Sequence, residues 1–157
     1  MTRIPVRTSA ALLASFLILT GCDAIRGVNR RALVRYVPPS DCVIGSLQSI
    51  QGVSSVRYEV RTGGTPLTWT GLKPPEKLHY YFYDLQGLHG NLYFSEDYKG
   101  KVEFWQGYIM INRTPRQVEI DTIRPVMRQL ERQLETECAL PNLSVTIKEW
   151  CSGVKCV

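Results

Sequence analysis

The sequence predicts an α+β domain built on an antiparallel sheet of about four to five strands, with two helices packed on one face. Several short runs alternate apolar and polar residues, as half-buried strands do. Two longer runs instead repeat their apolar residues at the spacing of an amphipathic helix. The order along the chain is helix, several strands, helix and strand, which favours a meander covered by helices.

The first helix is expected over residues 41–51. Its apolar residues recur at helical spacing and are Val43, Ile44, Leu47 and Ile50. Ser40 or Asp41 can cap its start, and Gly52 can end it. The preceding Pro38-Pro39 pair stiffens the chain, so the domain is expected to begin near residue 41.

Four strands are expected next, over residues 56–60, 78–84, 91–95 and 101–112. In the first, Val56, Tyr58 and Val60 alternate with charged residues. In the second, two sets of side chains point to opposite faces of the sheet. The expected core face carries Leu78, Tyr80 and Phe82, and the expected solvent face carries His79, Tyr81 and Tyr83.

A second helix is expected to begin near Thr114, which can act as its cap, with Gln117 at the capping-box position. Its apolar stripe consists of Ile123, Val126, Leu130, Leu134 and Cys138. Pro125 is expected either to kink this helix or to mark its true beginning after Asp121. The alternation of Leu143, Val145 and Ile147 predicts a last strand.

A short strand at residues 32–37 would bring the order close to a ferredoxin-like fold with an extra hairpin. The stretch around Cys42, with its helix and the following Gly52-Val53, is locally similar to heavy-metal-associated domains of that fold. Those domains bind metal through a Cys-x-x-Cys pair before the helix, whereas residues 40–45 offer only Cys42. The resemblance therefore implies a shape and no metal site.

The amino-terminal residues have the layout of a secretory signal, with Arg3 and Arg7 followed by an apolar run over residues 10–19. This run covers about 15 Å as a helix, half of a bilayer core of roughly 30 Å. It ends in Leu19-Thr20-Gly21-Cys22, which resembles the lipobox of bacterial lipoproteins. The resemblance implies cleavage before Cys22 and lipid attachment to its thiol. The alternatives are an ordinary signal peptide with a chance cysteine, or a short buried helix.

These segments predict three regions: a signal peptide over 1–21, a lipidated basic tether over 22–40, and a single globular domain over 41–157. Four arginines give the tether its charge against Asp23 alone, namely Arg26, Arg30, Arg31 and Arg35. Anionic headgroups would attract such a tether, although a solvated linker is the alternative. The remainder has equal numbers of basic and acidic residues, so nucleic-acid binding is not indicated. Asp23 resembles an inner-membrane retention signal of enteric bacteria, and other bacteria sort differently, so both membranes stay open.

The chain has five cysteines, and an odd number cannot all pair in an oxidising compartment. Lipid on Cys22 leaves four. Antiparallel helices would bring Cys42 to Cys138, and Cys151 and Cys156 would close a local loop. Pairing of Cys42 with Cys151 or Cys156 is the alternative. Zinc is disfavoured because the spacing contains no Cys-x-x-Cys.

No catalytic motif is recognisable, and His79 and His89 have no adjacent metal-binding partner in sequence. No catalytic residue, metal or cofactor is therefore expected. The candidate partner-binding residues are Tyr81, Tyr83, Tyr93 and Trp105, because clustered exposed aromatic rings mark partner sites. The alternative is that both sheet faces are covered. A basic stripe of Arg124, Arg128 and Arg132 is expected to form a solvated face with Glu131 and Glu135.

The expected function is that of a lipid-anchored, non-enzymatic protein of the bacterial envelope that binds another protein or assists assembly. The alternative is a lipoprotein that binds a small apolar ligand, and a third class is an envelope hydrolase. A closed cavity lined by Tyr80, Phe82 and Leu130 would favour the ligand. An open patch at Tyr81 and Tyr83 would favour the protein partner.

Overall fold

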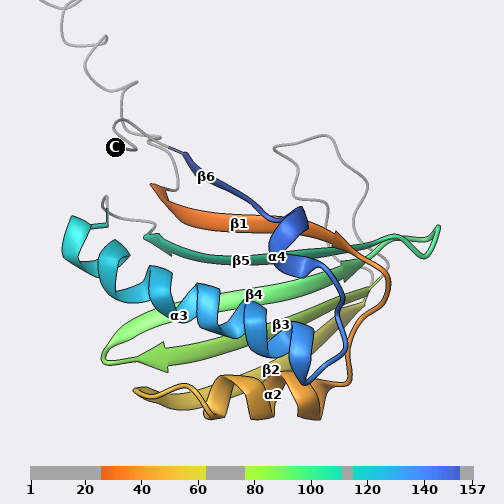
Figure 1. Cartoon of the computed structure of the whole chain (residues 1–157), viewed down its shortest axis with the longest axis horizontal. Helices are drawn as coiled ribbons and strands as arrows, with labels where there is room; N and C mark the ends of the chain where they lie inside the picture. The colour runs from red at the N-terminus through yellow and green to blue at the C-terminus, as the bar shows by residue number, and fades with distance from the viewer. Residues whose placement is uncertain (1–25, 63–76, 111–114, 153–157) are drawn as a thin grey trace, which may run out of the picture.

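The computed structural model describes residues 26–62, 77–110 and 115–152 (Figure 1). The elements in chain order are β1 (Arg26–Val34), α2 (Ser40–Gln48), β2 (Val53–Thr62), β3 (Lys77–Leu85), β4 (Leu88–Glu96), β5 (Val102–Met110), α3 (Gln117–Thr136), α4 (Leu143–Thr146) and β6 (Lys148–Ser152). The fold class is α+β, as the sequence predicted.

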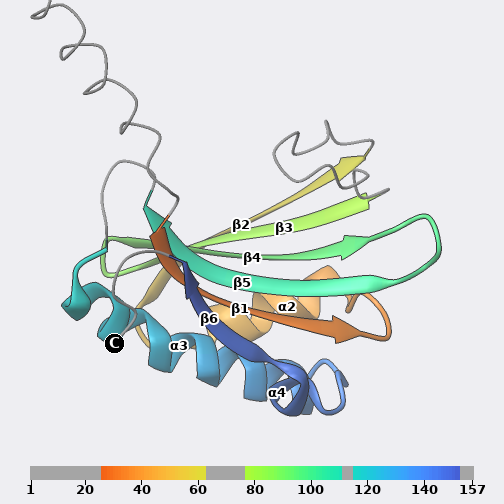
Figure 2. The same cartoon turned by 90° about the horizontal axis from the view of Figure 1, so that it is seen from above.

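The described strands form one six-stranded antiparallel sheet with the order β2-β3-β4-β5-β1-β6 (Figure 1). The prediction of four to five strands was too low. Figure 2 shows α2, α3 and α4 on one face of this sheet. We call this the helical face, and we call the opposite one the open face because no helix of the described residues covers it.

The strand β1 overturns the expected boundary at residue 41. Residues 26–34 pair with β5 on one side, and residues 27–31 also pair with β6 on the other, so about half of the expected tether lies inside the sheet. Val28 and Ala32 are buried on the helical face, and Arg30 between them pairs with Glu131 of α3. Because the charged Arg30 lies between the buried Val28 and Ala32, the sequence does not show the alternation of apolar and polar residues that identifies a strand.

The helix α2 ends at Gln48, three residues before the predicted end. Gly52 then adopts a φ of 91°, a left-handed conformation that glycine takes without steric cost. The turn delivers the chain into β2, whose Val56 and Tyr58 pack against the core as predicted. Val60 is exposed, so the apolar set of this strand is covered only along part of its length.

The helix α3 begins after Arg116 rather than at Thr114, which lies outside the described residues. The backbone N–H of Arg116 donates to the Glu119 carboxylate at 2.8 Å, which gives the reciprocal capping contact three residues apart. Pro125 neither ends the helix nor begins it, because α3 is continuous from Gln117 to Thr136. Asp121 and Pro125 are both exposed, so water can satisfy the carbonyl that loses its partner.

The predicted strand at residues 143–147 is instead the one-turn helix α4, and β6 follows it. Asn142 precedes the turn with a φ of 61°, which breaks the extended path. Leu143 is buried while Val145 is 83% exposed. Leu143 and Ile147 therefore both pack against the core, whereas Val145 does not, because one helical turn brings residues four apart to the same side.

The core lies between the helical face of the sheet and the three helices. Large side chains from β4, β5 and α3 fill it, including Leu92, Phe94, Phe104, Met127 and Leu130. Tyr81 and Tyr83 belong to this core, with exposed fractions of 0% and 2%. The predicted assignment of the two faces of β3 was therefore inverted, since Tyr81 and Tyr83 face the helices.

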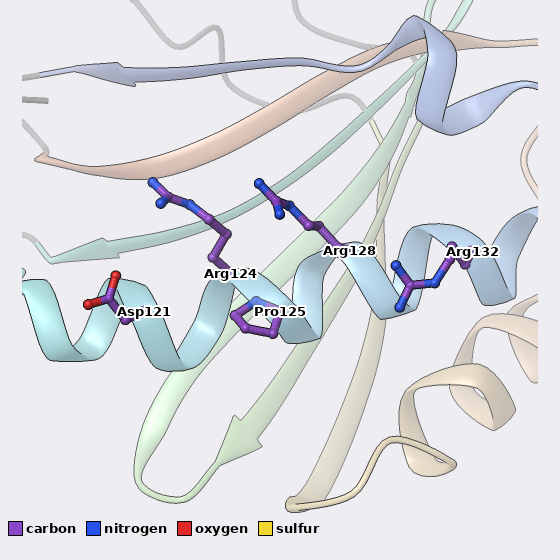
Figure 3. A pocket seen from close by; sticks show the side chains of 5 residues that line it. All are labelled: Asp121, Arg124, Pro125, Arg128 and Arg132. Atoms are coloured by element: carbon purple, nitrogen blue, oxygen red, sulfur yellow. The ribbon is translucent and has the colours of Figure 1, made fainter. Parts of the chain in front are cut away.

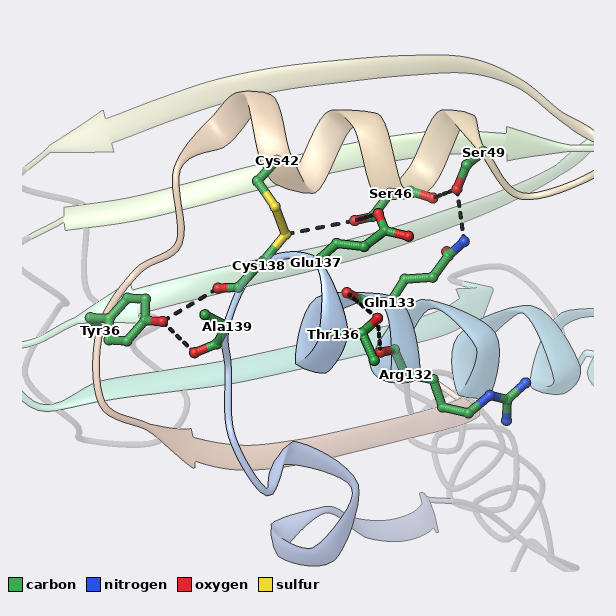
Figure 4. The surroundings of a disulfide bond; sticks show 10 residues. All are labelled: Tyr36, Cys42, Ser46, Ser49, Arg132, Gln133, Thr136, Glu137, Cys138 and Ala139. Carbon is green, nitrogen blue, oxygen red and sulfur yellow. Dashed lines mark hydrogen bonds between the residues drawn. A yellow bond between two sulfur atoms is a disulfide. The ribbon is translucent and has the colours of Figure 1, made fainter.

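Cys42 near the start of α2 and Cys138 just after α3 form a disulfide, as predicted (Figure 4). Beside it, the hydroxyl of Tyr36 donates to the backbone carbonyls of Cys138 and Ala139. These contacts tie the ends of both helices to the segment after β1. Cys151 lies in β6, and Cys156 lies outside the described residues, so the second predicted pair falls beyond this description.

Candidate functional site

A row of aromatic rings crosses the open face over three neighbouring strands. Tyr80 and Phe82 of β3 stack with their ring centroids 5.2 Å apart. Tyr80 contacts Tyr93 of β4 at 5.3 Å, and Tyr93 stacks on Trp105 of β5 at 5.1 Å. The row exists because Tyr80 pairs directly with Tyr93, and Tyr93 directly with Trp105, in the antiparallel register. We call these four residues the aromatic row.

Two arginines of the edge strand β2 cover one end of the aromatic row. The guanidinium carbon of Arg57 lies 4.7 Å from the centroid of Phe82, and that of Arg61 lies 5.2 Å from the centroid of Tyr80. A cation over an aromatic face is attracted by the ring quadrupole. Arg61 also pairs with Glu59. No carboxylate of the described residues lies within ion-pair distance of Arg57, so its charge has no acidic counterpart there.

Trp105 closes the other end of the aromatic row and is only 5% exposed. Its indole lies over Gly107, where a Cβ atom would come within 2.5 Å of Cη2 of that ring. The absence of a side chain at Gly107 is therefore what lets the indole lie flat along β5. Tyr80, Phe82 and Tyr93 are half-buried, so the accessible part of the row lies over β3 and β4.

Burial sets the chemistry of the tyrosines in the row. It raises the pKa of Tyr93 well above the ordinary range, and the nearby Glu103 acts in the same direction. Burial also raises the pKa of Tyr80, although Arg61 partly opposes that shift. Both phenols stay protonated at neutral pH. The face thus offers neutral rings beside a cation, which suits binding and offers no phenolate for catalysis.

The four predicted partner-binding residues divide between the two faces. Tyr93 and Trp105 lie in the aromatic row on the open face, whereas Tyr81 and Tyr83 lie in the core. The alternation along β3 placed Tyr80 and Phe82 on the core face, so they were not expected as surface residues. The alternation along β2 placed Arg57 on the solvent face correctly, but it could not show that Arg57 lies beside Phe82.

The predicted basic stripe lines a shallow pocket along α3, with a volume of about 270 Å³, and Arg124 and Arg128 extend from the helix toward the sheet (Figure 3). Its lining consists of Asp121, Arg124, Pro125, Arg128 and Arg132. The carboxylate of Glu149 on β6 pairs with Arg124 at 2.8 Å and approaches Arg128 at 3.9 Å.

The predicted partners of the stripe have other contacts. Glu131 points inward to Arg30, and Glu135 accepts hydrogen bonds from Ser144. The counter-charge on the stripe therefore comes from a neighbouring strand rather than from the same helix.

The two histidines lie apart. Nδ1 of His79 is 2.8 Å from the hydroxyl of Tyr58, and burial is the main cause that lowers the pKa of His79. His89 is mostly exposed and lies 3.3 Å from Asp84. The described residues contain no group of three potential metal ligands.

Cys22 lies outside the described residues, as does the predicted signal peptide. Among the helices that are described, none has both the length and the apolar character needed to cross a bilayer. Comparisons with protein families, curated proteins and solved structures gave no match to this chain.

Proposed function

We propose that this chain is a lipid-anchored, non-enzymatic protein of the bacterial envelope that binds another envelope protein through its open face. The signal-like segment and the lipobox-like Leu19-Thr20-Gly21-Cys22 support the anchor. The observation that carries the binding role is the aromatic row on a sheet face that none of the described helices covers. In this proposal Cys22 carries the lipid and the domain faces the periplasm or the cell surface.

The composition of the open face supports binding. When one face of an antiparallel sheet meets water, its residues are usually polar. Here four large rings occupy the middle of that face, and aromatic residues provide much contact area at low cost in conformational entropy. A partner that covers Tyr80 and Phe82 would remove apolar surface from water, which is favourable.

The charge of the face specifies the partner. Arg57 lies over Phe82 without an acidic partner in the described residues. A partner segment that places a carboxylate beside an apolar side chain would pair with Arg57 and cover the rings at once. We therefore propose a protein segment of mixed acidic and apolar character as the occupant of this face.

The ligand-binding alternative loses its proposed cavity. Tyr80 and Phe82 point to the open face, whereas Leu130 of α3 is buried in the core on the other side of the sheet. These three residues cannot line one pocket. The patch first expected at Tyr81 and Tyr83 is equally excluded by their burial, and the binding face moves to Tyr80, Phe82 and Arg57.

We also infer that the topology is a ferredoxin-like split βαβ arrangement with an inserted hairpin. In that fold, the first strand, a helix and the second strand are followed by a third strand that lies between the first two in the sheet. A second helix and an edge strand complete the fold. Here three consecutive strands, β3, β4 and β5, occupy that middle position.

Site-specific photocrosslinking in whole cells tests the binding face. With benzoylphenylalanine in place of Phe82, we expect one discrete adduct whose protein component mass spectrometry identifies. Arg57→Glu should reduce the adduct at least tenfold because it reverses the charge that pairs with the partner. Arg57→Lys should retain most of it, and Arg35→Glu, at an exposed position after β1, serves as the matched control. An adduct that is insensitive to Arg57→Glu would contradict the proposal.

Metabolic labelling tests the anchor separately. We expect the wild-type protein to incorporate palmitate and to sediment with membranes, and Cys22→Ser to do neither. Labelling that persists in Cys22→Ser would show that the lipid is not on this thiol.

A further inference from the structure

We propose that the end of the sheet at which β1 begins rests on the surface of the lipid bilayer. This inference depends on the proposed lipid at Cys22. It adds a surface of the folded domain to the anchor, so that the membrane is a contact partner of the protein as well as the place where its lipid is inserted. Three observations support it: the length of chain before β1, the elements that share its end, and the side chains exposed there.

The chain between the lipid and the sheet is short. Cys22 precedes Arg26, the first residue of β1, by four positions. Four residues in a fully extended chain span at most about 14 Å. Because diacylglyceryl chains hold Cys22 at the bilayer surface, the start of β1 cannot lie farther than this from the headgroups.

The strand β1 cannot lengthen the connection by peeling away from the sheet. It lies between β5 and β6, and Arg26 pairs with Met110 while Gly27 pairs with Ser152. Releasing the strand would break backbone hydrogen bonds on both sides and remove Val28 and Ala32 from the core. The first strand residues are therefore a rigid attachment point.

Antiparallel pairing decides which elements share this end. β5 ends where β1 begins, so β4 begins and β3 ends at the same edge. Figure 1 shows the start of α3 at this edge too, on the left, while α4 and the end of β1 lie toward the right. We call the left edge the anchor end and the right edge the distal end.

The side chains exposed at the anchor end suit a bilayer interface. Val118, in the first turn of α3, is 62% exposed although it is a large apolar residue. Arg116 precedes it, bonds Glu119 through its guanidinium, and still exposes 72% of its side chain. An apolar side chain that enters the headgroup region beside an arginine that reaches phosphate is the usual interfacial arrangement.

Contact of the anchor end with the bilayer would also place the open face close to the membrane. Nine strand residues at about 3.4 Å each give the sheet a length of roughly 31 Å. Added to the tether, this places the whole open face within about 45 Å of the bilayer surface. The aromatic row then faces sideways, so the partner is itself a membrane protein or lies against the membrane.

Photocrosslinking to lipid tests the seating in the intact lipoprotein. The purified, lipidated chain is reconstituted into phosphatidylethanolamine and phosphatidylglycerol vesicles that contain a trace of radiolabelled phospholipid. With benzoylphenylalanine at Val118, we expect at least fivefold more radiolabel on the protein than with the same group at Val145. Val145 is the matched control because it is an equally apolar, exposed valine at the distal end. Equal labelling at the two positions, or more at Val145, would overturn the seating.

A longer tether provides a second test of the contact between the anchor end and the bilayer. Twenty Gly/Ser residues inserted between Asp23 and Ala24 add a flexible reach of roughly 25 Å. We expect the longer chain to float with the vesicles as before, while labelling at Val118 falls at least threefold. Undiminished labelling would show that the short tether does not seat the domain.

The two proposals fail differently. If the chain floats with vesicles and carries lipid but Val118 is not labelled, the seating is wrong and the anchor stands. A chain that carries no lipid on Cys22 would overturn both.

Discussion

The guanidinium of Arg30 on β1 lies against the carboxylate of Glu131 on α3, and its Nη2 donates to Oε2 at 2.8 Å. Nε of Arg30 donates to Oε1, and the amide of Gln106 on β5 donates to the same carboxylate. Glu131 is only 2% exposed. Burial raises its pKa despite the opposing effect of Arg30. A residue first assigned to the tether thus bridges the sheet to the main helix.

Removing one partner of this pair should destabilise the fold strongly. Arg30→Ala leaves the Glu131 carboxylate buried without its cation, so we expect a loss of about 3 to 5 kcal/mol in the free energy of unfolding. Arg31→Ala is the control, because its contact with Glu103 at 3.8 Å is exposed and should contribute less than about 1 kcal/mol. Urea denaturation of the mature domain measures both. Equal losses would show that burial does not set the contribution of the pair.

The disulfide between Cys42 and Cys138 should account for a large part of the stability. Its sequence separation is 96 residues, and closing a loop of this size stabilises by about 4 to 5 kcal/mol on loop-entropy grounds. The double variant Cys42→Ala/Cys138→Ala should lose that amount in urea denaturation. The predicted Cys151–Cys156 pair would close a much shorter loop, so Cys151→Ala/Cys156→Ala should lose about 2 kcal/mol. The reverse ranking would contradict the entropic explanation.

Two tyrosines should respond oppositely to the loss of their hydroxyl groups. The hydroxyl of Tyr83 is buried without a hydrogen-bond partner among the described residues, so Tyr83→Phe should be neutral or stabilise by about 1 kcal/mol. Tyr36→Phe should destabilise by about 1 kcal/mol because its hydroxyl donates to the Cys138 and Ala139 carbonyls. Thermal unfolding of the two variants measures both effects. A clear loss of stability in Tyr83→Phe would contradict the prediction.

The position of the Trp105 indole depends on glycine at position 107, which has no side chain. Gly107→Ala places a Cβ 2.5 Å from the indole, so we expect a loss of about 1 to 3 kcal/mol from forced repacking. Gly45→Ala is the matched control on α2, where the new methyl group meets no atom within 4 Å and should stabilise the helix by roughly 0.5 to 1 kcal/mol. Chemical denaturation compares them, and a tolerated alanine at 107 would show that the indole is not held there.

Stability should fall in mild acid partly because of His79. Burial, with a contribution from Lys77, lowers the pKa of this imidazole in the folded state from its ordinary value of 6.5. Below that value the unfolded chain takes up a proton more readily than the folded chain, so the stabilising contribution is lost as the pH falls. The Tm of the wild type should therefore drop more between pH 8 and pH 5.5 than that of His79→Gln. Parallel curves would contradict this assignment.

The local patterns predicted much of the element content. Helical spacing identified α2 and α3, and alternation identified β2 to β5, because each pattern reports how one element divides its residues between core and solvent. The antiparallel placement of the two helices also predicted the Cys42 and Cys138 pair. The boundaries of α3 shifted because two capping sequences overlap, and Arg116 with Glu119 forms the cap that is used.

The candidate site depends on features that local sequence patterns do not predict. Alternation along β3 placed Tyr80 with Phe82, and Tyr81 with Tyr83, and both groupings are correct. Both sets are aromatic, however, so composition could not identify the one that faces the helices. The aromatic row also needs Tyr93 and Trp105 in register with β3, and sequence spacing does not give that register.

By itself, the sequence determined which residues share a face, because the geometry of a strand or helix fixes that locally. Only the tertiary structure decided which face is covered and that residues 26–34 complete the sheet. The reason is that covering a face requires the packing of α2 and α3 across it, and burying Arg30 requires Glu131, which lies 101 residues away along the chain. Such long-range contacts leave no local period in the sequence.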